Sequence, residues 1–189
     1  MTRDIVALAA GVVFIVAVIP YLIDIVRRKS KPNIVSWFSW TLLLSIATAA
    51  AFSAHESRTA YLTLGDAIAT GLVAVLGIKY GLAKFSKFDI YCQIGALLGL
   101  ALWFIFDSPT LAIVFSLGID LVASIPTFRH AWLDAGEETL ITYLLSAGAG
   151  ILTLLSLESF TVASMAFPIY LSLSNSLIAG ILRIRINGK

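Results

Sequence analysis

The chain has little charge and almost no cysteine or histidine. Asp, Glu, Lys and Arg together make up 13% of its 189 residues, and there are two His and one Cys. Soluble domains carry about a quarter charged residues, so this sequence lacks the polar surface that a water-soluble protein of its length needs. The lone Cys92 excludes an intrachain disulfide and a cysteine metal site.

Signatures of enzymes and of nucleic-acid binding are also missing. The sequence has no glycine-rich phosphate loop, no cluster of His or Cys, and no nucleophile beside a base. Its basic residues lie in short segments between apolar runs. We therefore expect no catalytic residues, no cofactor, no metal and no nucleic-acid partner.

Long apolar runs fill the sequence instead. Hydrophobic residues make up 59% of the chain, and the mean hydropathy is +0.96. A helix of roughly 20 apolar residues crosses a membrane, and cutting the chain at charged clusters and turn residues predicts seven such spans. They are residues 5–26, 33–54, 60–80, 90–106, 109–131, 139–157 and 161–182. The expected fold class is an all-α, multi-pass membrane protein with seven transmembrane helices.

The positive charges are distributed unevenly about these spans. With seven spans, only Arg3 and Arg58 of the 13 Lys and Arg residues fall on the side of the N-terminus. Short basic loops stay in the cytoplasm, so we expect a bacterial inner-membrane protein with its N-terminus outside and its C-terminus cytoplasmic. The first span is too long for the core of a signal peptide and is followed by basic residues, so we expect it to be retained.

The two ends of the chain resemble each other. The segment YLTLGDAIATG at 61–71 is similar to YLSLSNSLIAG at 170–180, and Ile-Pro at 19–20 recurs at 125–126. We therefore expect two three-helix halves, residues 1–82 and 109–189, joined by a linker helix within 83–108. Repeats separated by one helix share an orientation and are related by an axis along the membrane normal.

The residues between Pro20 and Trp40 add a motif to this layout. Pro20-Tyr21 is followed by Asp24, by the basic turn that ends at Pro32, and then by Ser36-Trp37 and Trp40. With the three-one-three layout, this pattern resembles the SWEET, SemiSWEET and PQ-loop superfamily over essentially the whole chain. The resemblance implies two parallel three-helix bundles and transport of a small solute by alternating access.

Asp66 is an ionisable residue inside the span 60–80, and Asn175 is its repeat mate. An ionisable group at membrane depth is costly unless it faces a cavity or a partner. The resemblance implies that Asp66 and Asn175 bind substrate in a central cavity, and Asp120 is a candidate for a proton relay with Asp66. For both aspartates, a neutral carboxylic acid bonded to a neighbouring helix is the structural alternative.

Pro20 and Pro126 occupy matching places in the two repeats. Because proline removes a backbone hydrogen bond and kinks a helix, we expect Pro20, with Tyr21, and Pro126 to form the hinges of an inner gate. Static kinks, which are common in membrane helices, are the alternative.

Four aromatic residues complete the candidate binding site, namely Trp40, Tyr61, Tyr143 and Tyr170. Trp40 and Tyr143 are candidates to stack on a solute. Tyr61 and Tyr170 come about one helical turn before the Asp/Asn pair, so they are candidates to line its cavity. An interfacial aromatic belt is the alternative for these residues.

These features predict a membrane transporter of a small polar solute, with a sugar as the first choice, acting by uniport or coupled to protons. The Asp at position 66, where the family has Asn, also fits a cationic, amino-acid or nucleoside-like solute. A ligand-binding receptor or sensor of the same fold and a small accessory subunit are alternatives. The expected partners are the solute and the lipid bilayer, and a homo-oligomer is compatible with the sequence.

Overall fold

The computed structural model is all-helical over the residues that it describes, which are 2–30, 32, 34–80, 108–133, 135–187 and scattered positions between 87 and 105. Six α-helices and one short 3-10 turn make up this part of the chain. They are α1 (Thr2–Val26), α2 (Ile34–Ser53), α3 (Ser57–Tyr80), α5 (Pro109–Leu133), η1 (Ala135–Glu137), α6 (Leu140–Ser156) and α7 (Val162–Asn187).

Each of these α-helices covers one of the predicted spans, with ends that differ by a few residues. The predicted linker span at 90–106 lies mostly outside the described residues. Three helices, α1, α3 and α7, are long and apolar enough to cross a membrane. The apolar stretches of α2, α5 and α6 are shorter, at 10–17 residues, which is about 26 Å at most for a helix and slightly less than the hydrocarbon thickness. The helices are thus compatible with a membrane protein.

Local sequence explains where several helices begin and end. At the end of α1, the Lys29 amide reaches the Asp24 carbonyl and Arg28 has a φ of 58°. The same left-handed cap ends α2, where His55 has a φ of 60°. Thr161 and Ser164 cap α7 reciprocally, each side-chain oxygen accepting the backbone N–H of the other at 3.1 and 2.9 Å.

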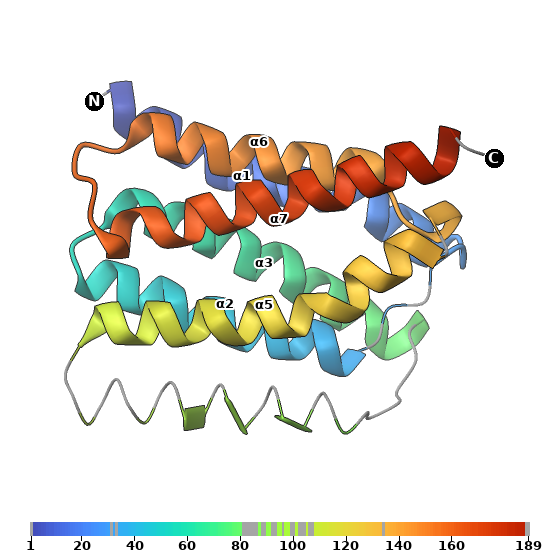
Figure 1. Ribbon diagram of the computed structural model, residues 1–189, viewed down its shortest axis with the longest axis horizontal. Coiled ribbons are helices and arrows are strands. Elements are labelled where there is room, and N and C mark those ends of the chain that lie inside the picture. The colour runs from blue at the N-terminus through green and yellow to red at the C-terminus, as the bar shows by residue number, and fades with distance from the viewer. Residues whose placement is uncertain are drawn as a thin grey trace.

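The helices lie side by side with their axes roughly aligned (Figure 1). In the first half, α3 packs against both α1 and α2, and in the second half α7 packs against both α5 and α6. Between the halves, α1 packs on α6 and α2 packs on α5, while α3 meets α7. If α1, α2 and α3 are replaced by α5, α6 and α7 respectively, and the reverse, each of these contacts becomes a contact of the same set.

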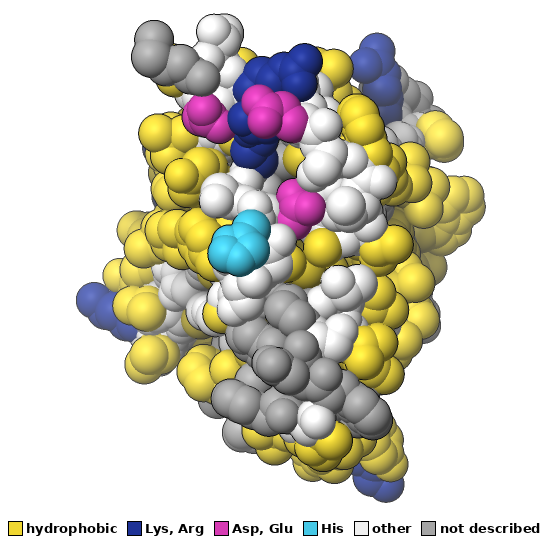
Figure 2. Space-filling view, turned by 90° about the vertical axis from the view of Figure 1, so that its left-hand side faces the viewer, with side chains coloured by type: hydrophobic (Ala, Val, Ile, Leu, Met, Phe, Trp, Pro, Cys, Tyr) yellow, Lys and Arg dark blue, Asp and Glu magenta, His cyan; other side chains and the backbone are white. Residues whose placement is uncertain are grey.

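The two ends of the bundle differ in the connections they carry. One end, here called the N-end, holds the N-terminus and the α2–α3 and α6–α7 connections (Figure 1). The opposite C-end holds the C-terminus and the α1–α2 and α5–α6 connections. Charged side chains gather over the N-end, and hydrophobic side chains cover the flanks around it (Figure 2).

Along α1, seven large apolar side chains point outward, and the buried face is rich in small residues beside Phe14, Val18 and Ile25. Its exposed large side chains recur every three or four residues, at Ile5, Leu8, Val12, Val16, Ile19, Ile23 and Val26. The buried face includes Ala7, Ala10, Gly11 and Ala17. This inverted pattern suits a helix whose outer face meets lipid and whose inner face lets neighbouring helices approach closely.

Glycine sets that close approach in both halves. A Cβ on Gly65 would collide with the backbone of Gly11, and a Cβ on Gly11 would collide with the Tyr61 carbonyl, so α1 and α3 touch backbone to backbone. In the second half, Gly150 of α6 leaves room for the Ser172 hydroxyl and the Pro168 carbonyl of α7.

Candidate functional site

Asp66 and Asp120 are both buried near the middle of their helices. Asp66 of α3 is 6% exposed and Asp120 of α5 is 9% exposed. Their carboxyl groups lie close enough to interact electrostatically. The structure thus places the two predicted acidic residues in one interior region of the bundle.

Tyr170 of α7 completes this cluster. Its hydroxyl interacts with the Asp120 carboxyl group and lies 2.9 Å from the Ser124 hydroxyl. Tyr170 therefore belongs to the interior and not to an interfacial belt. Ser124 was not among the residues singled out from the sequence, since one serine in an apolar helix carries no pattern that distinguishes it.

Asn175 is half-buried, and its side-chain amide donates to the Leu171 carbonyl of its own helix at 2.8 Å. No hydrogen bond to the Asp66 carboxyl group occurs among the described residues. The repeat mates thus differ in surroundings: Asn175 has a partner on its own helix, and Asp66 interacts with Asp120 and Tyr170.

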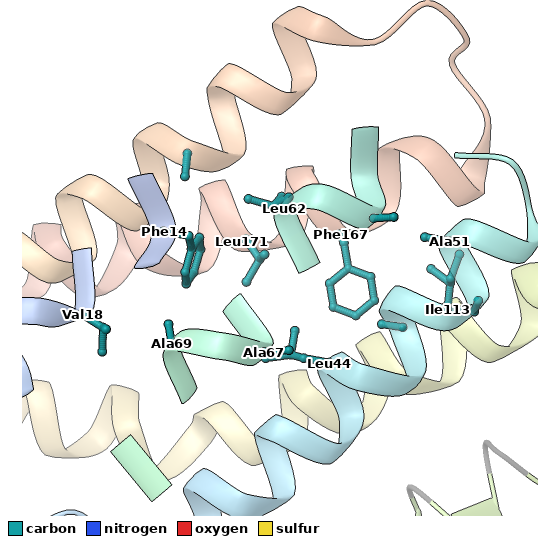
Figure 3. Close-up of a cluster of buried hydrophobic side chains, with 14 of the residues drawn as sticks. Phe14, Val18, Leu44, Ala51, Leu62, Ala67, Ala69, Ile113, Phe167 and Leu171 are labelled. Atoms are coloured by element: carbon teal, nitrogen blue, oxygen red, sulfur yellow. The ribbon is translucent and has the colours of Figure 1, made fainter. Parts of the chain in front are cut away.

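An apolar layer separates the acidic cluster from the N-end. Phe167 is 1% exposed, and with Leu62 and Ile113 it belongs to the main hydrophobic cluster. Each of these three residues precedes Tyr170, Asp66 or Asp120 on its own helix, and all three helices begin at the N-end. Figure 3 shows the Phe167 ring inside this layer, reaching from α7 toward α2.

Aromatic rings pack together on the other side, toward the C-end. The Trp37 ring lies 5.3 Å from that of Tyr21 and 5.0 Å, edge-on, from that of Trp40. Tyr143 donates a 2.6 Å hydrogen bond to Glu138. Trp40 and Tyr21 are thus engaged with Trp37, whereas Tyr61 lies near the N-end with its ring edge-on to Phe52 at 6.2 Å.

Two buried polar atoms in this region have no partner among the described residues. They are Nε1 of Trp40 and Oγ1 of Thr142. Buried donors and acceptors are normally satisfied by protein, water or a ligand. Both atoms are shielded from solvent in this conformation.

Three helix prolines bear on movement. Pro20 lies inside α1, which continues as helix to Val26. Position 126 lies within α5, but the side chain of Pro126 is outside the described residues. Pro168 lies fully buried inside α7. It has no proline counterpart in the first half, so the repeat does not single it out.

Charged side chains at the N-end join the two halves. Arg58 forms ion pairs of 2.8 Å with Asp4 of α1 and with Glu158 of the α6–α7 connection. Hydrogen bonding to the Arg58 guanidinium holds the pKa values of Asp4 and Glu158 below their ordinary range. Among the described residues, no group of three or more His, Cys, Asp or Glu is placed to hold a metal ion.

Comparison of the chain with protein-family models, with curated proteins and with solved structures gives no match in any of the three.

Proposed function

We propose that the protein is a proton-coupled transporter of a small polar solute that works by alternating access. The observation that carries this proposal is the pair Asp66 and Asp120, two interacting carboxyl groups buried in an otherwise apolar bundle. Ionisable residues at membrane depth are costly, and they commonly belong to solute or proton pathways. Two buried carboxylates that interact electrostatically disfavour each other's charge, so a proton on one of them or a bound cationic group stabilises the pair.

The surroundings of the pair fit such exchange. The Tyr170 hydroxyl interacts with Asp120 and is hydrogen-bonded to Ser124, which gives a proton on Asp120 polar neighbours. The free N–H of Trp40 and the hydroxyl of Thr142 offer further contacts to a hydroxyl-rich or amine-bearing solute. A sugar remains the first solute to test, and a cationic or amino-acid solute the second.

The membrane arrangement belongs to the same proposal. Seven spans in a three-one-three layout, in the bacterial inner membrane with the C-terminus in the cytoplasm, are supported by three observations. Eleven basic residues fall on one side of the predicted spans and only Arg3 and Arg58 on the other. Three helices are long and apolar enough to cross a membrane. Most contacts among α1–α3 and α5–α7 are unchanged when the two halves are exchanged, and the α3–α6 contact is the exception.

Transport by purified protein in liposomes tests the function. Labelled sugars, amino acids and nucleosides are offered with and without an imposed proton gradient. We expect saturable uptake of one class that rises with the gradient. In Asp66→Asn or Asp120→Asn protein, the response to the gradient should disappear. Asp4→Asn is the matched control, because Asp4 is an exposed aspartate at the N-end.

The other possible outcomes each contradict part of this proposal. Folded protein that moves none of these solutes contradicts transport. Stabilisation of the protein by a solute that it does not move would instead identify a receptor, because a ligand that binds only the folded state raises apparent stability. Gradient-dependent uptake that survives both Asp→Asn changes would remove the aspartates from the mechanism.

A further inference from the structure

The start of α7 is bonded to the first half of the protein, although it belongs by sequence to the second. Residues 157–167, here called the lid segment, comprise the α6–α7 connection and the first turn and a half of α7. Thr59 of α3 donates a buried 2.6 Å hydrogen bond to the Ser164 carbonyl. Glu56, in the α2–α3 connection, accepts a 2.9 Å hydrogen bond from the Thr161 hydroxyl.

Three weaker contacts tie the lid segment to the same half. Arg3 donates to the Leu157 carbonyl at 3.2 Å, Ser159 donates to Glu56 at 3.3 Å, and Arg58 pairs with Glu158 at 2.8 Å. Exposed pairs of this kind contribute little each. Together with the buried Thr59 bond, they run along the whole segment from its beginning to Ser164.

The rest of α7 is bonded to the second half. The Ser172 hydroxyl and the Pro168 carbonyl fit against Gly150 of α6, and Tyr170 is within hydrogen-bonding distance of Ser124 on α5. The boundary between the two bodies therefore falls inside α7, between Phe167 and Pro168.

Pro168 makes that boundary the weakest point of the helix. Proline has no N–H, so the carbonyl four residues earlier, that of Ser164, loses its partner within the helix. Thr59 supplies the missing donor from α3. A helix that lacks one of its own bonds bends there more readily, and the bond that replaces it holds the lid segment to the other half.

We propose that Pro168 is a hinge, that residues 157–167 move with the first half as a lid over the N-end, and that the Phe167 ring is the plug of that lid. Phe167 lies in the apolar layer between the N-end and the acidic cluster. Bending at Pro168 withdraws its ring and opens a path to Asp66 and Asp120. The gate is part of the proposed transport mechanism, but its movement can be measured without any transported solute.

Labelling of a buried cysteine tests the lid. Ser116 is 3% exposed and precedes Asp120 by one turn toward the N-end, so Ser116→Cys, in a Cys92→Ser background, reports access to the cluster. The probe is a water-soluble thiol reagent applied to the purified protein in detergent. We expect slow labelling with Phe167 present and labelling about tenfold or more faster in Phe167→Ala, because the lid loses its buried ring.

Matched variants distinguish the loss of the Phe167 ring from a general loosening of the helix bundle. Phe160→Ala removes an exposed ring from the same segment and should leave the rate unchanged. Phe167→Leu keeps apolar bulk and should give an intermediate rate. Each variant is first checked for the thermal transition of the folded protein, so that faster labelling reflects opening and not unfolding.

The hinge is tested at Pro168 itself. Pro168→Ala restores the missing N–H and stiffens α7, so labelling should slow severalfold. Pro168→Gly restores the N–H but keeps the backbone pliable, so labelling should stay near the unmodified rate. Equal rates in Pro168→Ala and the unmodified protein, or equal acceleration by Phe160→Ala and Phe167→Ala, would overturn the lid. If labelling follows the expected order while liposomes show no uptake, the lid stands and the transport function fails.

Discussion

The Oγ1 of Thr59 lies 2.6 Å from the carbonyl oxygen of Ser164 and donates a buried hydrogen bond to it, joining α3 to α7. Pro168 explains why this bond exists, because the Ser164 carbonyl would otherwise accept the N–H of residue 168. In lipid or in a dry interior, an unsatisfied carbonyl is costly, and a hydroxyl from a neighbouring helix is one of the few available donors. A defect in one helix thus becomes a contact between the two halves.

Removing the Thr59 hydroxyl should destabilise the protein only while Pro168 is present. Thr59→Val keeps the shape of the side chain and leaves the Ser164 carbonyl unsatisfied, so we expect a loss of about 1 kcal/mol. Thr59→Ser keeps the hydroxyl and should cost less. With Pro168→Ala, the helix supplies its own donor, and the further cost of Thr59→Val should fall toward zero. Thermal unfolding of the four variants in detergent measures this coupling, and additive effects would contradict it.

Alanine substitutions at four glycines should destabilise the protein where α1 and α3 cross closely and leave it stable where the glycine faces open space. Gly11→Ala and Gly65→Ala each place a methyl group against backbone, which cannot move aside as a side chain can. We expect each to cost about 1–3 kcal/mol. Gly118→Ala and Gly180→Ala are the controls, since nothing lies within 4 Å of either added Cβ.

At the two control positions, alanine should leave stability unchanged or raise it by up to about 1 kcal/mol, since it favours helix over glycine. Thermal transitions of the four purified variants give the comparison. Equal losses at all four positions would show that the close α1–α3 approach does not determine stability.

The sequence predicts the helices well because each one is an apolar run between charged or turn residues. For example, α1 ends at Val26 and α2 ends at Ser53, each within one residue of the end of its predicted span at 26 or 54. The similarity of segments 61–71 and 170–180 also predicts two repeated halves, and that division stays a prediction. These features depend on composition and local order, which the sequence displays directly.

Contacts across the bundle were harder to predict from the sequence. The closeness of Asp66 and Asp120 depends on how α3 and α5 rotate about their axes, and nearly uniform apolar composition hides that rotation. The repeat predicts that Asn175 and Asp66 bind substrate in a shared cavity; the Asn175 amide donates to the Leu171 carbonyl of its own helix, and the shared cavity stays a prediction. Pro168 could not be singled out from the sequence because it has no repeat mate and because its role depends on the hydrogen bond from Thr59.

Stability should depend on pH through the N-end ion pairs. Arg58 holds the pKa values of Asp4 and Glu158 below their ordinary values of 3.8 and 4.5. A carboxyl group whose pKa is lowered by folding stabilises the folded state above its unfolded pKa, and that contribution is lost as pH falls through the folded pKa. The ion-pair contribution is therefore present at neutral pH and is lost as pH falls below the ordinary values and then through the lowered pKa values of the folded protein.

Arg58→Gln tests this dependence. The variant should melt slightly lower than the unmodified protein at pH 7, and the difference should shrink as pH falls through the lowered pKa values of Asp4 and Glu158 and vanish once both carboxylates are protonated. Because the pairs are exposed to solvent, about 1 M salt should also reduce the difference. Arg183→Gln, which changes an exposed arginine at the C-end, is the matched control. A melting difference that is the same at every pH would mean that Arg58 acts by packing alone.

Glycine at the left-handed caps should stabilise the ends of α1 and α2. Arg28 and His55 have φ values of 58° and 60°, a region where a Cβ is strained and glycine is not. Each residue ends its helix with the bond pattern that usually places glycine there, such as the Glu56 amide donating to the Ala51 carbonyl at 2.9 Å.

His55→Gly and Arg28→Gly should therefore raise the free energy of unfolding by up to about 1 kcal/mol each. Ser53→Gly, two residues before His55 and still inside α2, should lower the free energy of unfolding, because there glycine only adds chain entropy to the unfolded state. Thermal unfolding of these three variants decides the matter, and a loss of stability in His55→Gly would show that the imidazole contributes more than its backbone strain costs.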